Sequence, residues 1–363
     1  MKEDQVGEPF VGGSGFLLTQ MLQAVGIRRR ACYITNVSKE RPPGNDFRAR
    51  YYEDKDGKYE KVELSELHRE LRDELQAVGA NITVALGEEA LRALSGHRGI
   101  GKWRGSLLAT PVGKVMPTYH PASVMRKYEQ RRVVEADLRR VVGESGSPEL
   151  TLPEHEVFLD PSFDCAFSLL NTLAVDRRPV AFDIETLGER VRCIALAWSA
   201  SEALCVPFVS CKVRVREEGG GNGLIVPLPT DTPFHSHWSE EEERALLEQL
   251  RRILSDPRVS LIAQNFPFDA GLLEREFGLT CRGLQMDTMV AQHCCYCELP
   301  KSLDFLCSFY TRVPRYSDYD ARSDLETWRY NCMDAMVTFE VAEALERELR
   351  EVEGLSGVGR NET

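Results

Sequence analysis

The sequence predicts an α/β protein built from two domains, and three observations lead to this prediction. A chain of 363 residues is long enough to form two hydrophobic cores. Strand-like and helix-like segments alternate in the first part, whereas the second part places three strand-like segments in succession. Between them, residues 143–156 are rich in Gly, Ser, Pro and acidic residues, which is typical of a linker. We therefore expect domains at 1–142 and 157–352, followed by a tail at 353–363.

In the first domain, short apolar segments alternate with amphipathic segments of helical period. The expected strands are 31–37, 82–87 and 114–120, and the expected helices are 62–78, 88–94 and 130–142. Such alternation predicts a parallel sheet with helices on its faces, and thus a three-layer parallel-sheet domain.

The second domain is ordered differently. The expected elements are a helix at 160–175, strands at 179–185, 191–199 and 203–209, a helix at 239–254 and a strand at 260–265. Consecutive strands with short connections pair antiparallel, so we expect a mixed sheet that opens with a meander. The Gly-rich residues 216–233 are expected to form a loop insertion.

Four acidic residues of the second domain occur where the local pattern directs them to one place. Asp183 and Glu185 are two positions apart in an apolar strand, so their side chains share a face. Asp269 closely follows the next apolar strand, and Tyr330 and Asp334 share one face of a helix because they are four apart. An isolated Asp-x-Glu pair is usually a solvated surface feature, but a buried strand rarely carries two unpartnered acids. Clustered carboxylates predict a site for divalent cations.

Residues 155–352 resemble the 3′–5′ exonuclease domain of family A DNA polymerases, of the DEDD type whose last motif carries a tyrosine. The resemblance rests on FDIET, NFPFD, MDTMVAQH, LPKSLDFLCSFYT and YNCMDA. It implies a ribonuclease H-like fold. The ligands that it implies for two Mg²⁺ or Mn²⁺ ions are Asp183, Glu185, Asp269 and Asp334. It further implies that Tyr330 orients the attacking water, and that Asp287 is a support residue or helix cap.

Residues 1–142 resemble the uracil-DNA glycosylase superfamily, most closely its family 4. The resemblance rests on GEPFVGGSGFLLTQML, YITNVSKERPPGN, ITVALGEEAL and TYHPASVMR, in this order. It implies that Phe10 stacks on a flipped uracil and that Asn36 reads the Watson–Crick edge of the base. It also implies that His120 donates a hydrogen bond to the uracil oxygen as the base departs. Without the resemblance, the three would be a core residue, a turn residue and a loop histidine.

Two departures from the family 4 pattern affect this domain. The family has a Gly-Glu-Ala-Pro-Gly turn on its first strand, whereas this chain begins at Met1, just past the position of that turn, so we expect an N-terminally truncated domain. The family holds an iron–sulfur cluster through four cysteines, but Glu40 stands at one of these positions and Cys32 is the only cysteine of residues 1–142. We therefore expect no iron–sulfur cluster, and glycosylase activity is left open.

Composition narrows the class of protein. No run approaches the roughly 18 apolar residues of a membrane span, and the start MKEDQVGEPF lacks the apolar core of a signal peptide. The eleven cysteines follow no disulfide or zinc-ribbon spacing, so we expect free thiols in a soluble cytoplasmic protein.

The net charge is −12, but residues 1–140 hold 24 Lys and Arg against 19 Asp and Glu, a net of +5, which leaves −17 for the rest. The basic part suits contact with a phosphate backbone.

As a whole, the chain resembles the front end of a phage-type family A DNA polymerase without its polymerase domain. Either the chain is a fragment, or the polymerase is a separate subunit that acts as its partner. We expect metal-dependent removal of nucleotides from single-stranded or frayed 3′ ends of DNA. Three alternatives stay open: a uracil-directed repair enzyme with an active glycosylase domain, an N-terminal half that only binds DNA or a replisome partner, and an exonuclease that acts on RNA.

Overall fold

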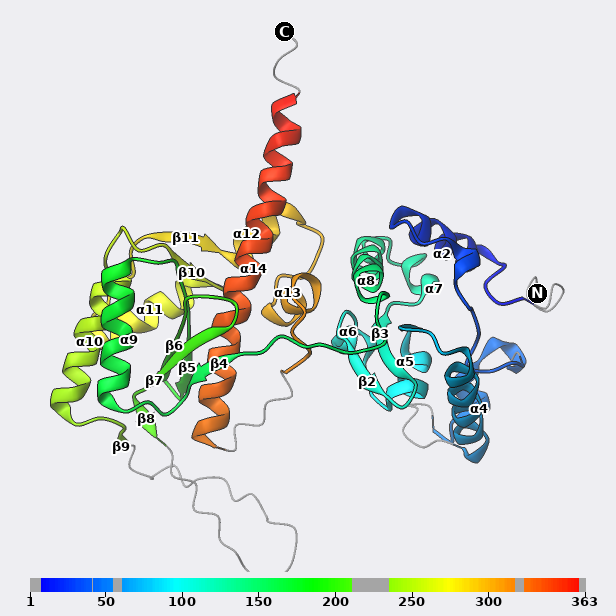
Figure 1. The fold of residues 1–363 in the computed structure, drawn as a ribbon, viewed down its shortest axis with the longest axis horizontal. Helices are drawn as coiled ribbons and strands as arrows, with labels where there is room; N and C mark the ends of the chain where they lie inside the picture. Colours follow the sequence, from blue (N-terminus) through cyan, green and yellow to red (C-terminus); the bar gives the residue numbers. More distant parts are fainter. Residues whose placement is uncertain (1–7, 41, 55–60, 211–234, 317–322, 359–363) are drawn as a thin grey trace, which may run out of the picture. The chain divides into compact units, whose positions relative to one another are not determined.

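The computed structural model describes residues 8–40, 42–54, 61–210, 235–316 and 323–358 (Figure 1). The loop insertion expected at 216–233 lies outside the described residues. The chain forms two compact units: the first contains residues up to Leu152 together with Arg312–Arg315, and the second contains the other residues from Pro153 onward. The chain thus passes between the units inside the segment expected to be a linker. Among the described helices, none has the length and apolar character needed to cross a bilayer.

The first unit contains a three-stranded sheet in the order β1-β3-β2. Its strands are β1 (Thr83–Leu86), β2 (Leu108–Thr110) and β3 (Gly113–Thr118), and its longer helices are α2 (Gly13–Ala24), α4 (Val62–Val78), α5 (Glu88–Ser95) and α8 (Gln130–Glu144). β1 and β3 are parallel, as predicted, but β2 runs antiparallel to β3, so the sheet is mixed rather than wholly parallel. The physical reason is the two-residue connection from Thr110 to Gly113, which can only form a hairpin.

Helices cover both faces of this sheet, which gives the predicted three layers. Val84 and Leu86 pack with apolar residues of α2 and α8, whereas Ala85, between them, packs with residues of α4 and α5. The predicted helices correspond to α4, α5 and α8. The strand predicted at 31–37 is not formed among the described residues; a short 3-10 helix, η1 (Arg29–Ala31), precedes irregular chain there. Local β-propensity produces a strand only where a neighbouring strand offers free backbone groups.

A buried ion pair joins Arg104, which follows the short helix α6 (Ile100–Trp103), to Asp137 of α8. Arg104 is 0% exposed and Asp137 is 2% exposed. The guanidinium of Arg104 donates through Nε and Nη2 to the two carboxylate oxygens of Asp137, and Thr118 Oγ1 donates to Asp137 Oδ2 at 2.6 Å. The full set of partners is what makes two buried charges tolerable.

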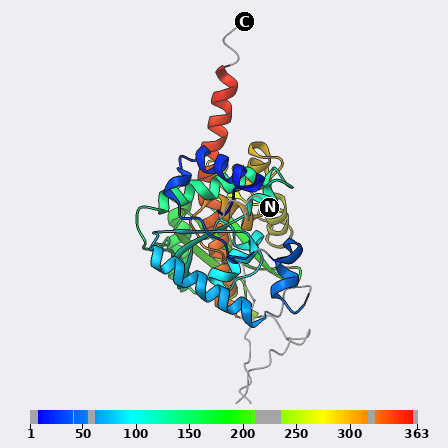
Figure 2. The same cartoon turned by 90° about the vertical axis from the view of Figure 1, so that its right-hand side faces the viewer.

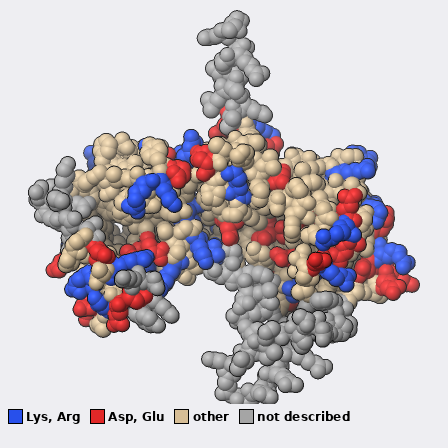
Figure 3. All heavy atoms as spheres, turned by 180° about the vertical axis from the view of Figure 1, so that it is seen from behind, with Lys and Arg blue, Asp and Glu red and all other residues tan. Residues whose placement is uncertain are grey.

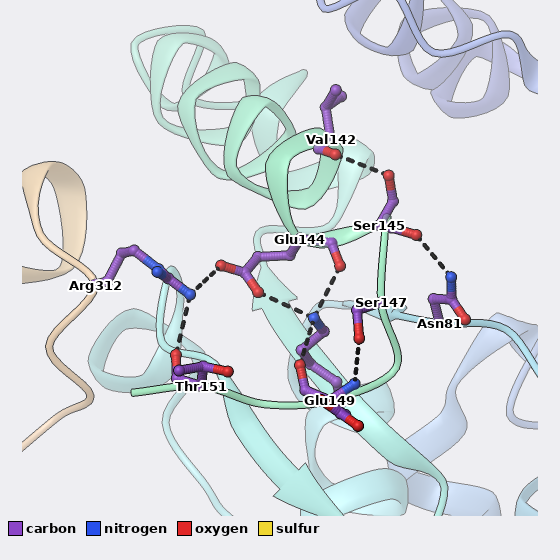
Figure 4. Close-up of polar contacts among 9 residues, drawn as sticks. Asn81, Val142, Glu144, Ser145, Ser147, Glu149, Thr151 and Arg312 are labelled. Atoms are coloured by element: carbon purple, nitrogen blue, oxygen red, sulfur yellow. Dashed lines mark hydrogen bonds and ion pairs between the residues drawn. The ribbon is translucent and has the colours of Figure 1, made fainter. Parts of the chain in front are cut away.

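Polar contacts also hold the segment that follows α8 (Figure 4). Lys114 Nζ donates to the backbone carbonyls of Glu144 at 2.8 Å and Glu149 at 3.1 Å, and it pairs with the Glu144 carboxylate at 3.0 Å. Arg312 Nη2 pairs with the same carboxylate at 2.7 Å and donates to the Thr151 carbonyl at 3.0 Å. The first part of the expected linker is therefore packed on the first unit rather than free.

The second unit contains a six-stranded mixed sheet in the order β11-β10-β5-β6-β7-β4. Its strands are β4 (Glu156–Phe158), β5 (Val180–Leu187), β6 (Arg190–Ala197), β7 (Glu202–Pro207), β10 (Leu261–Ala263) and β11 (Leu284–Asp287). β5, β6 and β7 form the predicted antiparallel meander, and β10, β11 and β4 join it by parallel pairing. The prediction of a mixed sheet is confirmed.

Helices cover the two faces of this sheet unequally. They are α9 (Phe163–Asp176), α10 (Glu240–Leu254), α11 (Phe266–Phe277), α12 (Thr288–Cys295), α13 (Leu303–Tyr310) and α14 (Asp324–Val358). One face packs on α9, α10 and α11, and the other on α14. α14 is a single continuous helix (Figure 1), and its C-terminal turns are seen again in Figure 2. The sheet residues that face α14 are mostly small: Ala181, Cys193, Ala195, Ala197, Ala203 and Cys205. Small side chains allow close packing, which brings the polar residues of α14 up to β5.

Charged side chains are mixed on the surface. On the face of each unit that Figure 3 shows, basic and acidic residues lie next to one another. The net positive charge of residues 1–140 therefore does not form a single basic stripe on that face.

Candidate active site

The acidic motif of β5 faces α14. Asp183 and Glu185 flank Ile184, which is buried in the core on the opposite face, so the alternation predicted for a strand is present. Tyr330 and Asp334 lie on α14. One ligand oxygen from each of Asp183, Glu185 and Asp334 can be chosen so that the three lie within 4.8 Å of one another. Packing of α14 on the sheet therefore gathers three of the four predicted acids.

Asp269 lies beside this trio rather than within it. It occupies the first turn of α11, is 4% exposed, and accepts a hydrogen bond from the backbone N–H of Ile184. That amide lies between the two acids of β5, so Asp269 is held close to them. The helix follows Asn265, whose φ of 61° lies in the left-handed region. A non-glycine residue in that region is a strained turn, of the kind often found at functional sites.

Asp287 stabilises this turn. Its carboxylate accepts hydrogen bonds from the backbone N–H groups of Asn265 at 3.1 Å and Phe266 at 3.0 Å. It also caps α12 by accepting from the backbone N–H of Met289 at 2.9 Å. The predicted role as a support residue and helix cap is confirmed.

Burial and mutual repulsion raise the pKa values of the clustered carboxyl groups. Burial is the largest cause for Asp183, whose pKa lies well above its usual value, and the charges of neighbouring acids, Asp334 first, add to it. Burial raises the pKa of Asp269 to about 7 and that of Asp334 to about 7. Burial raises the pKa of Glu185 less strongly because the nearby Arg192 guanidinium opposes it. A site of this kind favours bound protons or cations, and a set of carboxylate oxygens fits a hard divalent cation.

Two phenol groups lie at Asp334. Tyr316 Oη donates to Asp334 Oδ1 at 2.7 Å, and the ring centroids of Tyr316 and Tyr330 are 5.7 Å apart. Tyr330 also donates a hydrogen bond to Asp334. Burial raises the pKa of both phenols above the ordinary value, so both are protonated donors at neutral pH. The sequence pattern predicts Tyr330 but not Tyr316, because no motif or spacing marks the latter residue.

Asn331 is a second residue at this site that the sequence pattern did not predict. It is 0% exposed and its Nδ2 donates to Asp183 Oδ2 at 2.6 Å. Its only sequence signal is its position inside the Tyr-x-x-x-Asp motif. On the same helix, Asp324 pairs with Arg192 of β6 at 2.7 Å.

In the first unit, the structure brings two of the three predicted uracil-pocket residues together. The ring centroids of Phe10 and His120 are 5.4 Å apart, and His120 Nδ1 accepts from the backbone N–H of Ala122 at 3.1 Å. Asn36 is exposed and lies on an irregular segment. Phe10 has a φ of 57°, in the left-handed region, and its carbonyl packs on Gly15, where a Cβ would lie 1.6 Å from that oxygen. The loop that carries Phe10 therefore requires a glycine at position 15.

A mixed sheet with carboxylates gathered between its central strand and a covering helix suits a nuclease that uses divalent cations. Comparison with protein families agrees with this class. Residues 164–350 match the family described as 3′-5′ exonuclease, and residues 1–139 match the uracil DNA glycosylase superfamily. The chain belongs to the 3′–5′ exonuclease family, its N-terminal part belongs to the uracil-DNA glycosylase superfamily, and the protein is an enzyme with a nuclease domain.

Known proteins similar to the first unit are type-4 uracil-DNA glycosylases. The one from Archaeoglobus fulgidus is 33% identical over 159 residues, which are 41% of this chain and 74% of that protein. The one from Thermotoga maritima is 35% identical over 144 residues, which are 38% of this chain and 69% of that protein. Among solved structures, the catalytic core of RRP6 from Trypanosoma brucei is 16% identical, with 57% of this chain and 50% of that chain covered, and a TM-score of 0.39. The origin in a phage-type polymerase stays a prediction.

Proposed function

We propose that this chain removes nucleotides from the 3′ ends of DNA, with two Mg²⁺ or Mn²⁺ ions bound at the clustered carboxylates. The observation that supports the proposal is the approach of Asp183, Glu185 and Asp334 to within 4.8 Å of one another, inside the stretch that matches the exonuclease family. Asp269, held next to β5 by the Ile184 amide, completes the proposed ligand set.

Bound divalent cations would activate a water molecule and stabilise the charge that develops on the leaving 3′ oxygen. The residues of the chain supply the remaining functions. Tyr330 is protonated and holds its hydroxyl beside Asp334, where it orients the attacking water. The three carboxylates are half-buried between β5 and α14, and we propose that a paired terminus has to separate before its last phosphate reaches them. Single-stranded and frayed ends are therefore the proposed substrates, as in proofreading.

The test is a cleavage assay on oligonucleotides labelled away from the 3′ end, with and without Mg²⁺, on matched DNA and RNA. We expect stepwise shortening from the 3′ end of DNA that requires the cation. Asp183→Ala should abolish cleavage, because it removes a ligand, whereas Glu248→Gln on the exposed face of α10 should leave cleavage unchanged. Cleavage that persists in Asp183→Ala or in excess chelator would disprove the proposal. Faster shortening of RNA than of DNA would reassign the substrate.

The proposal extends to the setting of the reaction. A proofreading exonuclease acts on ends that a polymerase produces, so we propose a polymerase domain or subunit as its partner in DNA replication. The cysteines of the described residues carry free thiols, which suits the cytoplasm. Co-purification with a polymerase activity from the native source, and its loss after high-salt washing, would test for a separate subunit.

A second candidate function is excision of uracil by the first unit. The observation that favours it is the strained loop that carries Phe10 next to His120. Arg29 fixes this loop, since its Nη2 donates to the carbonyls of Pro9 and Phe10, each at 3.1 Å. A strained residue held by several partners is more typical of a binding site than of simple core packing. Type-4 uracil-DNA glycosylases are the relatives of this unit.

A base-release assay on single-stranded DNA with one uracil separates catalysis from binding. Release that is lost in His120→Ala would support an active glycosylase. Binding of uracil-containing DNA without release would instead support a DNA-binding module. If binding without release survives the change of both Phe10 and Asn36 to Ala, the uracil pocket has no part in it.

A further inference from the structure

The side chain of Asn331 connects three elements of the second unit beneath the candidate active site. It projects from α14, is 0% exposed, and donates through Nδ2 to Asp183 Oδ2 on β5 at 2.6 Å. On its other side, Cys193 of β6 donates through Sγ to Asn331 Oδ1 at 3.4 Å. Both polar atoms of the amide group are therefore engaged, one by a proposed metal ligand and one by a buried thiol.

The amide is a suitable donor for a carboxylate that binds a cation. Asp183 is surrounded by other acids, and their repulsion acts to turn its carboxylate away from the common centre. A lysine or arginine would hold the group but would also neutralise it and compete with a divalent cation. A neutral amide fixes one oxygen and leaves the negative charge for the cation.

Cys193 determines which way the amide faces. An asparagine side chain can rotate so that its oxygen and nitrogen exchange places. In the observed orientation, the thiol donates to the amide oxygen and the amide nitrogen faces Asp183. In the reverse orientation, the amide oxygen would face a carboxylate oxygen, and two acceptors in contact repel each other. A thiol donor at this point therefore favours the productive orientation.

We propose that Asn331 is a positioning residue for the exonuclease reaction: with its amide oriented by Cys193, it holds the carboxylate of Asp183 ready to bind a divalent cation. This inference deepens the proposed function and rests on it. Asn331 itself is buried, so it acts through Asp183 and touches neither substrate nor solvent.

The test measures Mn²⁺ binding by calorimetry and the Mn²⁺ dependence of 3′ cleavage in the full chain. The variants are Asn331→Ala, which removes the amide, and Asn331→Asp, which keeps the shape but sets a carboxylate against Asp183. Loss of a group that orients a metal ligand commonly weakens metal binding or activity about 10- to 100-fold. We expect a weakening of that order in both variants, with a larger effect in Asn331→Asp.

Thr338→Ala is the matched control. Thr338 lies seven residues further along α14, is also 0% exposed, and its hydroxyl has no hydrogen-bond partner among the residues that the structure describes. Its replacement disturbs the buried face of the same helix without removing a contact to a ligand, so Mn²⁺ binding should match that of the parent protein. Cys193→Ser keeps a donor and should also match it, whereas Cys193→Ala should weaken binding by a smaller factor than Asn331→Ala. The two cysteine variants compare the presence and the absence of a donor to the Asn331 amide, with no substitution in α14.

Three outcomes are distinguishable. Weaker Mn²⁺ binding in the Asn331 variants, with thermal unfolding of the metal-free protein no lower than in Thr338→Ala, supports the proposal. Parent-like Mn²⁺ binding and activation in both Asn331 variants, while Asp183→Ala loses them, overturns it and leaves Asn331 a packing residue. Parent-like Mn²⁺ binding in Asp183→Ala as well overturns the metal site of the proposed function, and this inference with it.

Discussion

Replacement of Asp334 by Asn should abolish cleavage and yet stabilise the metal-free protein at alkaline pH. The carboxyl group of Asp334 has a pKa raised to about 7 by burial and by nearby acids, against an ordinary value of 3.8. Below pH 4 it is protonated in the folded and the unfolded chain, so it has no effect on stability. Between pH 4 and 7 only the folded chain keeps the proton, so stability falls as pH rises. Above pH 7 the Asp334 carboxyl group is ionised in both the folded and the unfolded chain, and the full loss of stability remains.

The difference of about 3 pKa units corresponds to at most about 4 kcal/mol at pH 8, of which roughly 2 to 3 kcal/mol develops between pH 5 and 8. Asn has nearly the shape of Asp, and its side-chain oxygen can still accept from Tyr316 Oη, which donates to Asp334 Oδ1 at 2.7 Å. The variant should therefore lose the charge without losing the packing.

Urea unfolding in chelator at pH 5 and pH 8 measures the effect. We expect the free energy of unfolding of Asp334→Asn to exceed that of the parent by more at pH 8 than at pH 5. For the control Glu248→Gln, the difference from the parent should be the same at both pH values. Addition of Mg²⁺ should stabilise the parent at pH 8 and have little effect on Asp334→Asn. A variant that is less stable than the parent at pH 8, or whose advantage does not grow with pH, would refute the reasoning that repulsion among buried carboxylates strains this site.

The remaining predictions concern both units. Tyr330→Phe should slow cleavage about 100-fold or more, since an orienting hydroxyl is lost, with Mn²⁺ affinity unchanged by calorimetry; a parent-like rate would exclude the proposed role. Gly15→Ala should disrupt the loop of Phe10, because the added Cβ would lie 1.6 Å from the Phe10 carbonyl oxygen, and a lower melting temperature together with weaker binding of uracil-containing DNA would show it. Arg104→Met should destabilise the first unit by about 3–5 kcal/mol, since it leaves the carboxylate of Asp137 buried and unpaired; urea unfolding would detect this, and a change below about 1 kcal/mol would contradict it.

The sequence predicted most elements of the fold because their signals are local. The period of apolar residues revealed α4, α8 and α10, and the meander of β5, β6 and β7 followed from three apolar runs with short connections. The failures were matters of pairing. The hairpin of β2 made the first sheet mixed, and residues 31–37 found no strand to pair with among the described residues. Strand pairing depends on which segments meet in the folded chain, and the residues of a single segment do not predict its partner.

The candidate site shows the same contrast between local sequence signals and contacts that form only in the folded chain. Spacing alone placed Asp183 and Glu185 on one face of a strand, and Tyr330 and Asp334 on one face of a helix, because side-chain direction follows the backbone repeat. Whether the two faces meet was decided by α14, which packs against small residues of the sheet. Asn331 and Asp183 are 148 positions apart, yet a hydrogen bond of 2.6 Å joins them. The donors that hold the carboxylates, and the crowding that raises their pKa values, exist only once the helix and the sheet are in contact.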